Sequence, residues 1–219
     1  TNFDLLKFIR KKNKKILLST GASTLKDVEN ALKILRSKKK KNITILQCNS
    51  AYPTPLKDLN INVLKTFKKK FKFNIGFSDH SLSTVAAAGA VALGASVVEK
   101  HFTLSRKMKG PDHKSSLEPK ELKEMIKNIR EIELALGESY KILSSSEKNN
   151  QKIIRKSLVA NCLINKGEKF TKKNITSKRP GYGITPMKIK KVLGKKAKKI
   201  FYTDELIKLW TNIKKIKYV

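Results

Sequence analysis

The chain has 219 residues, 39% of them hydrophobic, and a formal net charge of +33. This length and composition suit one large or two small globular domains. No segment approaches the ~18 consecutive apolar residues of a membrane span, and residues 1–12 do not form a signal peptide. Two distant cysteines, Cys48 and Cys162, predict neither a disulfide framework nor a zinc site. We therefore expect a cytoplasmic protein with no membrane partner.

The excess of positive charge suggests a polyanion-binding protein as one hypothesis, because basic surfaces attract phosphate backbones. The lysines, however, are scattered through every segment, and only six of the 50 basic residues are arginines, the residue that nucleic-acid readers prefer. We therefore expect no nucleic-acid partner. A non-catalytic module that clamps a polyanion stays as the alternative from another class, and it predicts DNA retention that falls steeply with salt.

Short apolar runs alternate with amphipathic helical segments along the first 137 residues. A helix is predicted first, at 2–12. Strands follow at 14–20, 42–50, 73–81 and 95–104, and helices at 23–39, 59–71, 84–94 and 118–137. Thr24 and Asp27 predict a capping box at one helix start, whereas Pro119 and Gly137 mark the two ends of the last helix.

This alternation, with a period of ~30 residues, predicts parallel strands joined by right-handed crossovers. The continuous apolar character of the strands favours a sheet covered on both faces. Four units are too few for a closed eight-stranded barrel, which takes ~250 residues. We expect an α/β fold in which residues 1–143 form the C-terminal half of a (β/α)8 TIM barrel. Such a half barrel would leave two strand edges open and fold poorly alone.

The sequence changes character after this region. The polar segment 144–154 is predicted to be a linker. Beyond it, short strand-like pieces and frequent turns predict a small β-rich domain at 155–213, with a tight turn at 165–168 and a rigid loop at 178–183.

Polar side chains follow the predicted strands, at the edge where parallel sheets and barrels carry their chemistry. His80 and His101 end two successive strands at equivalent positions. One histidine at a strand end is more often structural, but two at matching positions can bind one divalent cation and leave sites open for water and substrate. With oxygen donors completing the shell, Mn²⁺ or Mg²⁺ is the expected metal.

Neighbouring residues leave alternatives open. Asp79 and Glu99 could orient the imidazoles or form buried ion pairs. His113 is as well explained by a loop contact as by metal ligation, whereas Asp112 in the same loop suits substrate hydroxyls. Tyr52, in a loop stiffened by two prolines, either covers the rim or contacts substrate.

Five segments carry a resemblance to a known family: STG, LQCNSAYPTP, IGFSDHS, VEKHFTL and GPDHKSSLEP. In this order and spacing they closely resemble the N-acetylneuraminate (sialic acid) synthases, and synthases of legionaminic and pseudaminic acids share much of the pattern. The tail resembles the antifreeze-like SAF domain, a β-clip fold, that follows the barrel in that family. The resemblance covers nearly the whole chain.

The resemblance implies a metal-dependent transferase that condenses phosphoenolpyruvate with an open-chain N-acyl sugar such as N-acetylmannosamine. The products would be a nine-carbon 2-keto sugar acid and phosphate; legionaminic acid synthesis is the alternative within the family. By resemblance, His80 and His101 are catalytic as the metal ligands. Substrate contacts are implied at Ser19, Ser50, Tyr52, Ser78, Asp112 and, in trans, Arg179.

The same resemblance implies a homodimer with exchanged SAF domains, in which Arg179 serves the partner's active site. Position 50 carries serine where family members carry asparagine. The family's catalytic glutamate and phosphoenolpyruvate-binding lysines correspond to positions upstream of Thr1. This chain alone is therefore expected to lack turnover.

Overall fold

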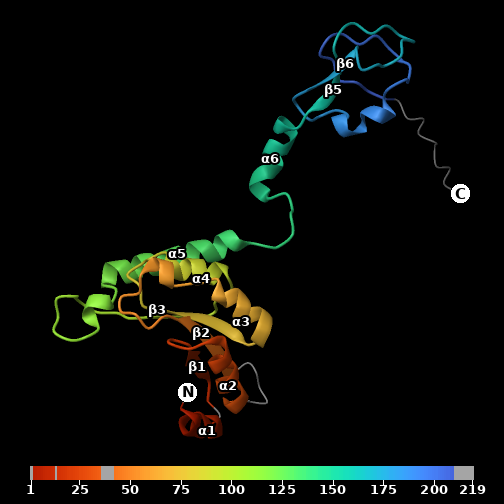
Figure 1. Cartoon of the computed structure of the whole chain (residues 1–219). Helices are drawn as coiled ribbons and strands as arrows, with labels where there is room; N and C mark the ends of the chain where they lie inside the picture. Colours follow the sequence, from red (N-terminus) through yellow and green to blue (C-terminus); the bar gives the residue numbers. More distant parts are fainter. Residues whose placement is uncertain (1, 13, 36–41, 210–219) are drawn as a thin grey trace, which may run out of the picture. The chain divides into compact units, whose positions relative to one another are not determined.

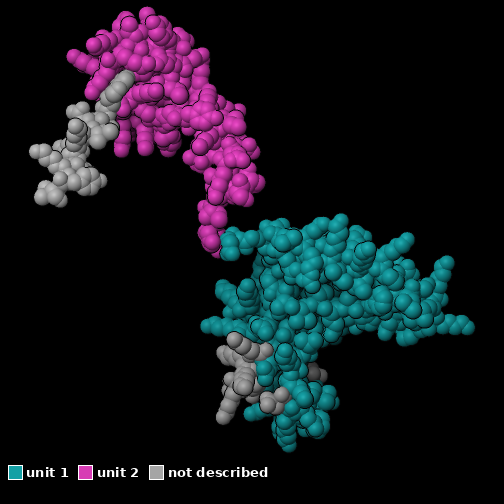
Figure 2. Space-filling view, turned by 180° about the vertical axis from the view of Figure 1, so that it is seen from behind, with its two compact units in different colours: residues 1–138 teal, residues 139–219 magenta. Residues whose placement is uncertain are grey.

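The computed structural model describes residues 2–12, 14–35 and 42–209. The chain divides into two compact units, Thr1–Glu138 and Ser139–Val219, which Figure 2 colours separately. Residues 36–39 of one predicted helix and 210–213 of the predicted small domain lie outside the described residues. In the described part of the chain, no helix is both long and apolar enough to cross a membrane.

The first unit is an α/β structure built on a curled, four-stranded parallel sheet in the order β1-β2-β3-β4 (Figure 1). Its strands are β1 (Ile16–Ser19), β2 (Ile43–Cys48), β3 (Asn74–Asp79) and β4 (Val98–Lys100). Its helices are α1 (Phe3–Lys11), α2 (Leu25–Leu35), α3 (Val63–Phe71), α4 (Ala86–Ala92) and α5 (Pro119–Leu136), with short 3-10 turns at Leu56–Asp58 and His113–Ser115. The predicted alternation of strands and helices is confirmed.

The helix ends form where the sequence places capping residues. The backbone N–H of Thr24 donates to Asp27 Oδ2 at 2.9 Å, and the N–H of Asp27 donates to Thr24 Oγ1 at 3.3 Å. Pro119 occupies the first turn of α5, and Gly137 ends that helix with φ of 50°, a value that glycine adopts without strain. Local sequence therefore fixes where α2 and α5 begin.

The two faces of the sheet differ in chemistry, because side chains alternate along each strand. Ile45, Ile75 and Phe77 point to the helices and pack with Leu64 and Phe67 of α3 in the main core. Figure 1 shows α4 and α5 running together over the β3 side of the sheet. Residues at the alternate positions form the second face, and most of the polar side chains discussed below belong to it.

The second face is not fully covered. Leu17 of β1 is 52% exposed, whereas the apolar strands had predicted burial on both sides. Among the described residues, helices cover only one face of this sheet. The prediction from the apolar residues of β1 that both faces are buried is therefore wrong at Leu17.

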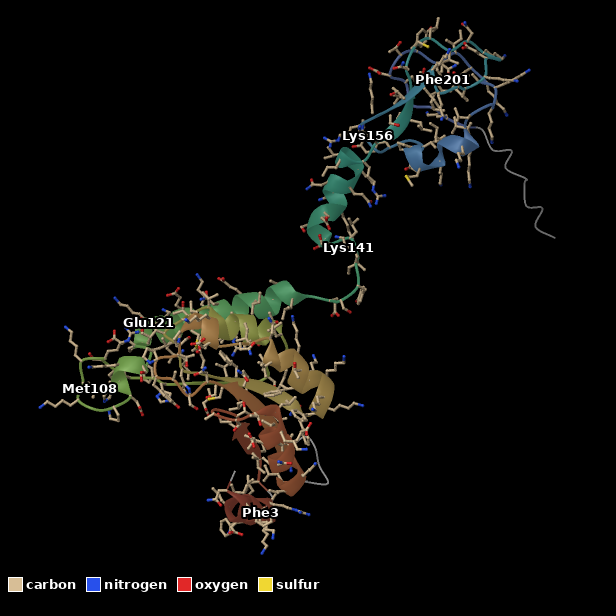
Figure 3. All side chains as sticks on the ribbon, viewed as in Figure 1. Phe3, Met108, Glu121, Lys141, Lys156 and Phe201 are labelled. Carbon is tan, nitrogen blue, oxygen red and sulfur yellow. The ribbon has the colours of Figure 1, made fainter. Side chains whose placement is uncertain are left out.

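The second unit contains α6 (Ser145–Ile154), the antiparallel pair β5 (Ser157–Ala160) and β6 (Ile175–Lys178), and a 3-10 segment η4 (Pro186–Lys191). Its separate core includes Phe170 and Phe201, whose rings lie 5.6 Å apart; Figure 3 labels Phe201. The expected linker 144–154 is thus largely helix α6. Ser144 and Glu147 form its capping box, an S-x-x-E signal that the sequence carries.

Candidate metal and substrate site

The register of β3 and β4 sets the two histidines side by side. Ser78 pairs with Glu99 and Asp79 with Lys100 in parallel register, so the next step along both strands places His80 opposite His101. Their ring centroids lie 5.1 Å apart, with the ring planes at 82°. Two imidazoles this close can contribute to one cation.

A backbone contact orients the His80 ring. Its Nδ1 lies 2.6 Å from the carbonyl oxygen of Asn49, and Cys48 Sγ lies 3.7 Å from the same nitrogen. Because a carbonyl oxygen only accepts hydrogen bonds, Nδ1 carries the proton and Nε2 keeps its lone pair. A metal-binding histidine is usually held in this way, with its second nitrogen donating to a carbonyl or carboxylate.

Tyr52 lies against both histidine rings. Its ring centroid is 4.2 Å from that of His80 and 5.6 Å from that of His101, while half of the side chain is exposed. Partial burial raises the pKa of the Tyr52 hydroxyl, and the nearby Cys48, Asp112 and Glu99 raise that pKa further. The phenol therefore stays protonated at neutral pH and can donate a hydrogen bond.

The acidic neighbours of the histidines have separate partners. Glu99 Oε1 accepts a hydrogen bond from Ser78 Oγ at 2.7 Å on the second face. Asp79 lies on the helix-covered face and forms an ion pair with Lys100 at 2.8 Å. Of the two roles open to Asp79, the structure shows the buried ion pair; Glu99 is hydrogen-bonded to a serine instead.

The loops after β1 and β2 meet beside His80. Ser19 ends β1 and is exposed, as is Ser50 in the loop after β2. A Cβ atom added to Gly21 would collide with Ser50 Oγ and lie 3.1 Å from Cys48 Sγ. The loop after β1 thus packs closely against the side chains of Cys48 and Ser50.

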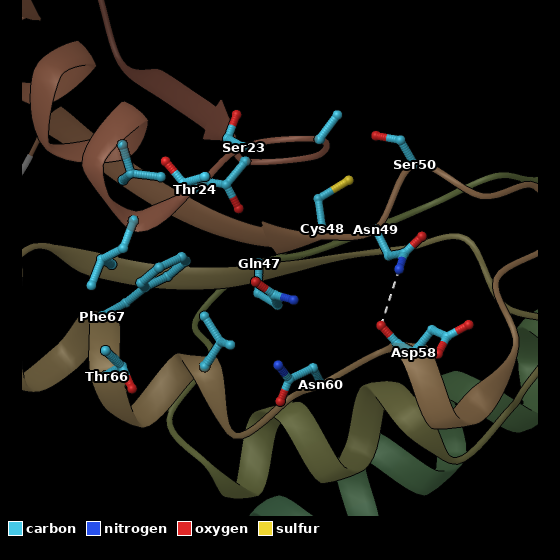
Figure 4. Close-up of a pocket in the computed structure, with 15 residues that line it drawn as sticks. Ser23, Thr24, Gln47, Cys48, Asn49, Ser50, Asp58, Asn60, Thr66 and Phe67 are labelled. Atoms are coloured by element: carbon cyan, nitrogen blue, oxygen red, sulfur yellow. Dashed lines mark hydrogen bonds between the residues drawn. The ribbon is translucent and has the colours of Figure 1, made fainter.

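An open cavity of about 740 Å³ adjoins the histidines, between α2, α3 and these two loops (Figure 4). Hydroxyl and amide side chains form much of its lining, and Cys48 and Asn49 belong both to this lining and to the surroundings of His80. Asn49 is fixed by a hydrogen bond from its Nδ2 to the Asp58 carbonyl at 3.1 Å (Figure 4). No histidine lines the cavity, so it extends the site without containing the imidazoles.

The loop between β4 and α5 carries Asp112 and His113; Figure 3 labels Met108 in this loop and Glu121 in α5. His113 Nδ1 lies 2.7 Å from Thr103 Oγ1, so His113 makes a contact within its loop. Asp112 is exposed, and it faces the site closely enough for its charge to raise the pKa of Tyr52, after burial and Cys48. The structure thus brings together Ser78, His80, His101, Tyr52 and Asp112.

Arg179, the remaining predicted residue, lies in the second unit. Its Nε donates to the Ile154 carbonyl at 3.0 Å and its side chain is exposed. That contact joins the end of β6 to the end of α6.

The donor set fits a divalent cation held by few protein ligands. Within residues 2–12, 14–35 and 42–209, no group of three or more His, Cys, Asp or Glu side chains is placed to hold a metal. A cation held by His80 and His101 would therefore have two protein ligands here, and water or substrate oxygens would fill its other positions. Such a set suits Mn²⁺ or Mg²⁺ better than a closed structural zinc site.

Comparison with known proteins identifies the family. Residues 1–141 match the NeuB family model, and residues 155–209 match the SAF domain. The chain belongs to the NeuB family. Among its relatives, the N,N'-diacetyllegionaminic acid synthase of Campylobacter jejuni is 48% identical over 210 residues, covering 95% of this chain and 63% of the relative. A pseudaminic acid synthase of the same species is 37% identical, with coverage of 90% and 57%.

A solved NeuB-family relative supports the fold. The N-acetylneuraminic acid synthetase of Leptospira borgpetersenii, crystallised with citrate, is 35% identical and superimposes with a TM-score of 0.62. The alignment covers 68% of this chain and 52% of that one. The chain thus spans less than two thirds of the length of these relatives.

Sequence analysis named Glu99 but missed its hydrogen bond with Ser78, and it did not single out Gly21 or the Asn49 carbonyl. Glu99 could have been found as a partner of Ser78, since each lies two residues before a histidine on the same face of its strand. The signal for Gly21 was its place directly after a predicted strand, in the STG segment that carries part of the resemblance. The Asn49 carbonyl had no signal, because any residue supplies one.

Proposed function

We propose that this chain is the metal- and sugar-binding part of a nonulosonic acid synthase. It would condense phosphoenolpyruvate with an N-acyl sugar aldehyde to give a nine-carbon 2-keto sugar acid and phosphate. The parallel sheet would then be part of a (β/α)8 barrel, and the second unit a β-clip SAF domain. The observation that carries this proposal is the facing pair His80 and His101 under Tyr52.

The reaction would join C3 of phosphoenolpyruvate to the aldehyde carbon, after which water adds at C2 and phosphate leaves with C–O cleavage. A divalent cation on His80 and His101 would supply Lewis-acid polarisation of the aldehyde oxygen. The proton on Nδ1 of His80 keeps Nε2 available for that cation. Tyr52, protonated at neutral pH, would donate a hydrogen bond to the sugar, and Asp112 would accept from its hydroxyls.

Phosphoenolpyruvate would be bound in part by the serine hydroxyls Ser19, Ser50 and Ser78, which can donate to phosphate and carboxylate oxygens. Ser78 is 1% exposed and already donates to Glu99, so it suits a positioning role beneath the substrate. Ser50 is exposed and lines the adjoining cavity, whereas Ser19 is exposed at the end of β1 and lies outside its lining.

For the sugar, one observation favours the legionaminic alternative over N-acetylmannosamine. The legionaminic acid synthase of Campylobacter jejuni is 48% identical to this chain, against 35% for the N-acetylneuraminic acid synthetase of Leptospira borgpetersenii. We therefore propose a diacetamido sugar as the first substrate to test beside N-acetylmannosamine.

The test uses the Campylobacter jejuni relative, in which this chain replaces the aligned segment. Phosphate release from phosphoenolpyruvate would be measured with each sugar, with Mn²⁺ or Mg²⁺ and with EDTA. We expect metal-dependent turnover of the hybrid, none with His80→Ala or His101→Ala, and none from the 219-residue chain alone. His113→Ala is the matched control and should keep activity, since the hydrogen bond described for this histidine, with Thr103, lies within its own loop.

Two results would contradict the proposal. Undiminished turnover of the His80→Ala hybrid would remove the metal role. DNA retention by the chain that falls steeply with salt, unchanged by His80→Ala, would instead support the polyanion-binding alternative.

We propose further that the protein is a homodimer in which Arg179 completes the partner's active site. Hybrids carrying His80→Ala and Arg179→Ala would each be inactive, but a mixture would regain about a quarter of the activity, since half of the randomly formed dimers contain one intact site. A mixture that stays inactive while dimers form would contradict the exchange.

A further inference from the structure

The two residues that precede the histidines form a buried ion pair on the opposite face of the sheet. Asp79 lies directly before His80, and Lys100 lies directly before His101. Lys100 Nζ is 2.8 Å from Asp79 Oδ2, and the two side chains are only 4% and 0% exposed. We propose that Asp79 and Lys100 are positioning residues that set the spacing of His80 and His101; this rests on the proposed metal role of the histidines.

The ion pair also holds the loop that leaves β3. Lys100 Nζ donates to the Ser81 carbonyl, and Asp79 Oδ1 accepts a hydrogen bond from the Ser81 N–H at 2.8 Å. Both backbone polar groups of Ser81, its N–H and its carbonyl, are therefore held by this pair. Since His80 lies between Asp79 and Ser81, its backbone is held on both sides.

A second cross-strand contact acts from the other face. Ser78 Oγ donates to Glu99 at 2.7 Å, one register step before the ion pair. The strands are thus tied at two successive steps, once on each face, and the histidines occupy the third step. With both faces tied, β4 cannot slip or rotate against β3 without breaking a polar contact.

Stability alone does not explain a charged pair at this depth. Removing two charges from water costs about as much as their attraction returns, and an apolar pair of similar volume is often equally stable or more so. The ion pair adds a fixed geometry, because Lys100 must contact both Asp79 and the Ser81 carbonyl at once. Outer residues that orient metal ligands typically change metal affinity 10- to 100-fold when mutated.

The test is Mn²⁺ binding to the Campylobacter jejuni hybrid that carries this chain, measured from the electron paramagnetic resonance signal of free Mn²⁺, with circular dichroism to check that each variant is folded. We expect Asp79→Asn and Lys100→Met each to weaken binding about 10- to 100-fold, and the double variant to lose no more than the worse single variant. Lys127→Met with Glu131→Gln, an exposed pair on α5, is the matched control and should bind as the parent does.

The outcomes separate the two proposals. If His80→Ala abolishes binding but Asp79→Asn and Lys100→Met bind like the parent, the positioning role is overturned and the metal site stands. If the parent binds no Mn²⁺, or His80→Ala changes nothing, the metal site fails and the positioning role fails with it. A purely structural pair would lower the unfolding midpoint and leave the affinity of folded protein unchanged.

Should Asp79→Asn not fold, Asp79→Glu answers the same question. This variant keeps the negative charge but lengthens the side chain by one methylene group. Its carboxylate can then no longer contact both Lys100 Nζ and the Ser81 N–H in the present geometry. We expect weaker Mn²⁺ binding from this folded variant, and parental affinity would overturn the inference.

Discussion

Replacing Gly76 by alanine tests whether the tight packing around β3 leaves room for a side chain at this position. Gly76 lies in β3, two residues before Ser78, on the same face of the sheet. A Cβ atom there would lie 2.5 Å from Leu46 Cδ2 and 2.7 Å from the Val97 carbonyl oxygen. Leu46 is completely buried, and the Val97 carbonyl accepts the backbone N–H of Phe77 at 2.9 Å. Neither atom can retreat without disturbing the sheet.

The cost follows from these distances. Carbon atoms in contact lie about 3.5 to 4.0 Å apart, so the Leu46 side chain or the β3 backbone must shift by about 1 Å. Overpacking of a filled core costs about 1 to 3 kcal/mol, and the weakened backbone hydrogen bond adds about 1 kcal/mol. We expect Gly76→Ala to lower the free energy of unfolding by about 2 to 4 kcal/mol.

Hydrogen exchange of a peptide spanning 74–79 measures this loss within the first unit, because core amides exchange through its global opening. The control is Gly89→Ala in α4, where the nearest atom to a new Cβ is the mobile end of Ile61, at 3.2 Å. Alanine favours helix, so this variant should be neutral or about 0.5 to 1 kcal/mol more stable. If Gly76→Ala matched the parent within about 0.5 kcal/mol, the tight-packing argument would be refuted.

Two further predictions concern loops around the predicted site residues. The Arg106 guanidinium lowers the pKa of Glu121 below its ordinary 4.5. The stability that this pair contributes is therefore present above pH 4.5 and is lost as the pH falls through the lowered pKa. Glu121→Gln should lower the free energy of unfolding by about 1 kcal/mol at pH 7, measured by urea unfolding, and remove this part of the acid dependence. Ser157 Oγ donates to the Pro180 carbonyl at 2.7 Å and accepts from the Gly183 N–H at 2.8 Å. Ser157→Ala should therefore lower the free energy of unfolding by about 1 to 3 kcal/mol and speed hydrogen exchange in the 178–183 loop. Unchanged exchange in this loop would contradict the prediction.

The sequence sufficed to predict the features that have a period. Alternating apolar runs indicated parallel strands, and equivalent positions at the ends of two successive strands predicted that His80 lies beside His101. Capping residues predicted the start of α2 at Thr24 and of α5 at Pro119. Each of these signals depends on residues near one another in the chain or on a repeated spacing.

Features that depend on three-dimensional contacts carried no comparable signal. Asn49 orients His80 through a backbone carbonyl, which every residue has. The partner of Asp79 is Lys100, 21 residues away, and lysines are so frequent in this chain that none could be singled out. Exposure of Leu17 depends on what covers the second face, which the strand's own residues do not determine.

The electrostatics of the rim argue for a cation rather than a polyanion at this place. Despite the net charge of +33, the charges that raise the pKa of Tyr52 include those of Asp112 and Glu99, after burial and Cys48. Carboxylates at the mouth would repel a phosphate backbone but would attract a divalent ion toward His80 and His101. Lys100, which directly precedes His101, is neutralised by its ion pair with Asp79 on the helix-covered face of the sheet. The charges beside Tyr52 therefore favour a divalent cation over a polyanion next to the two imidazoles.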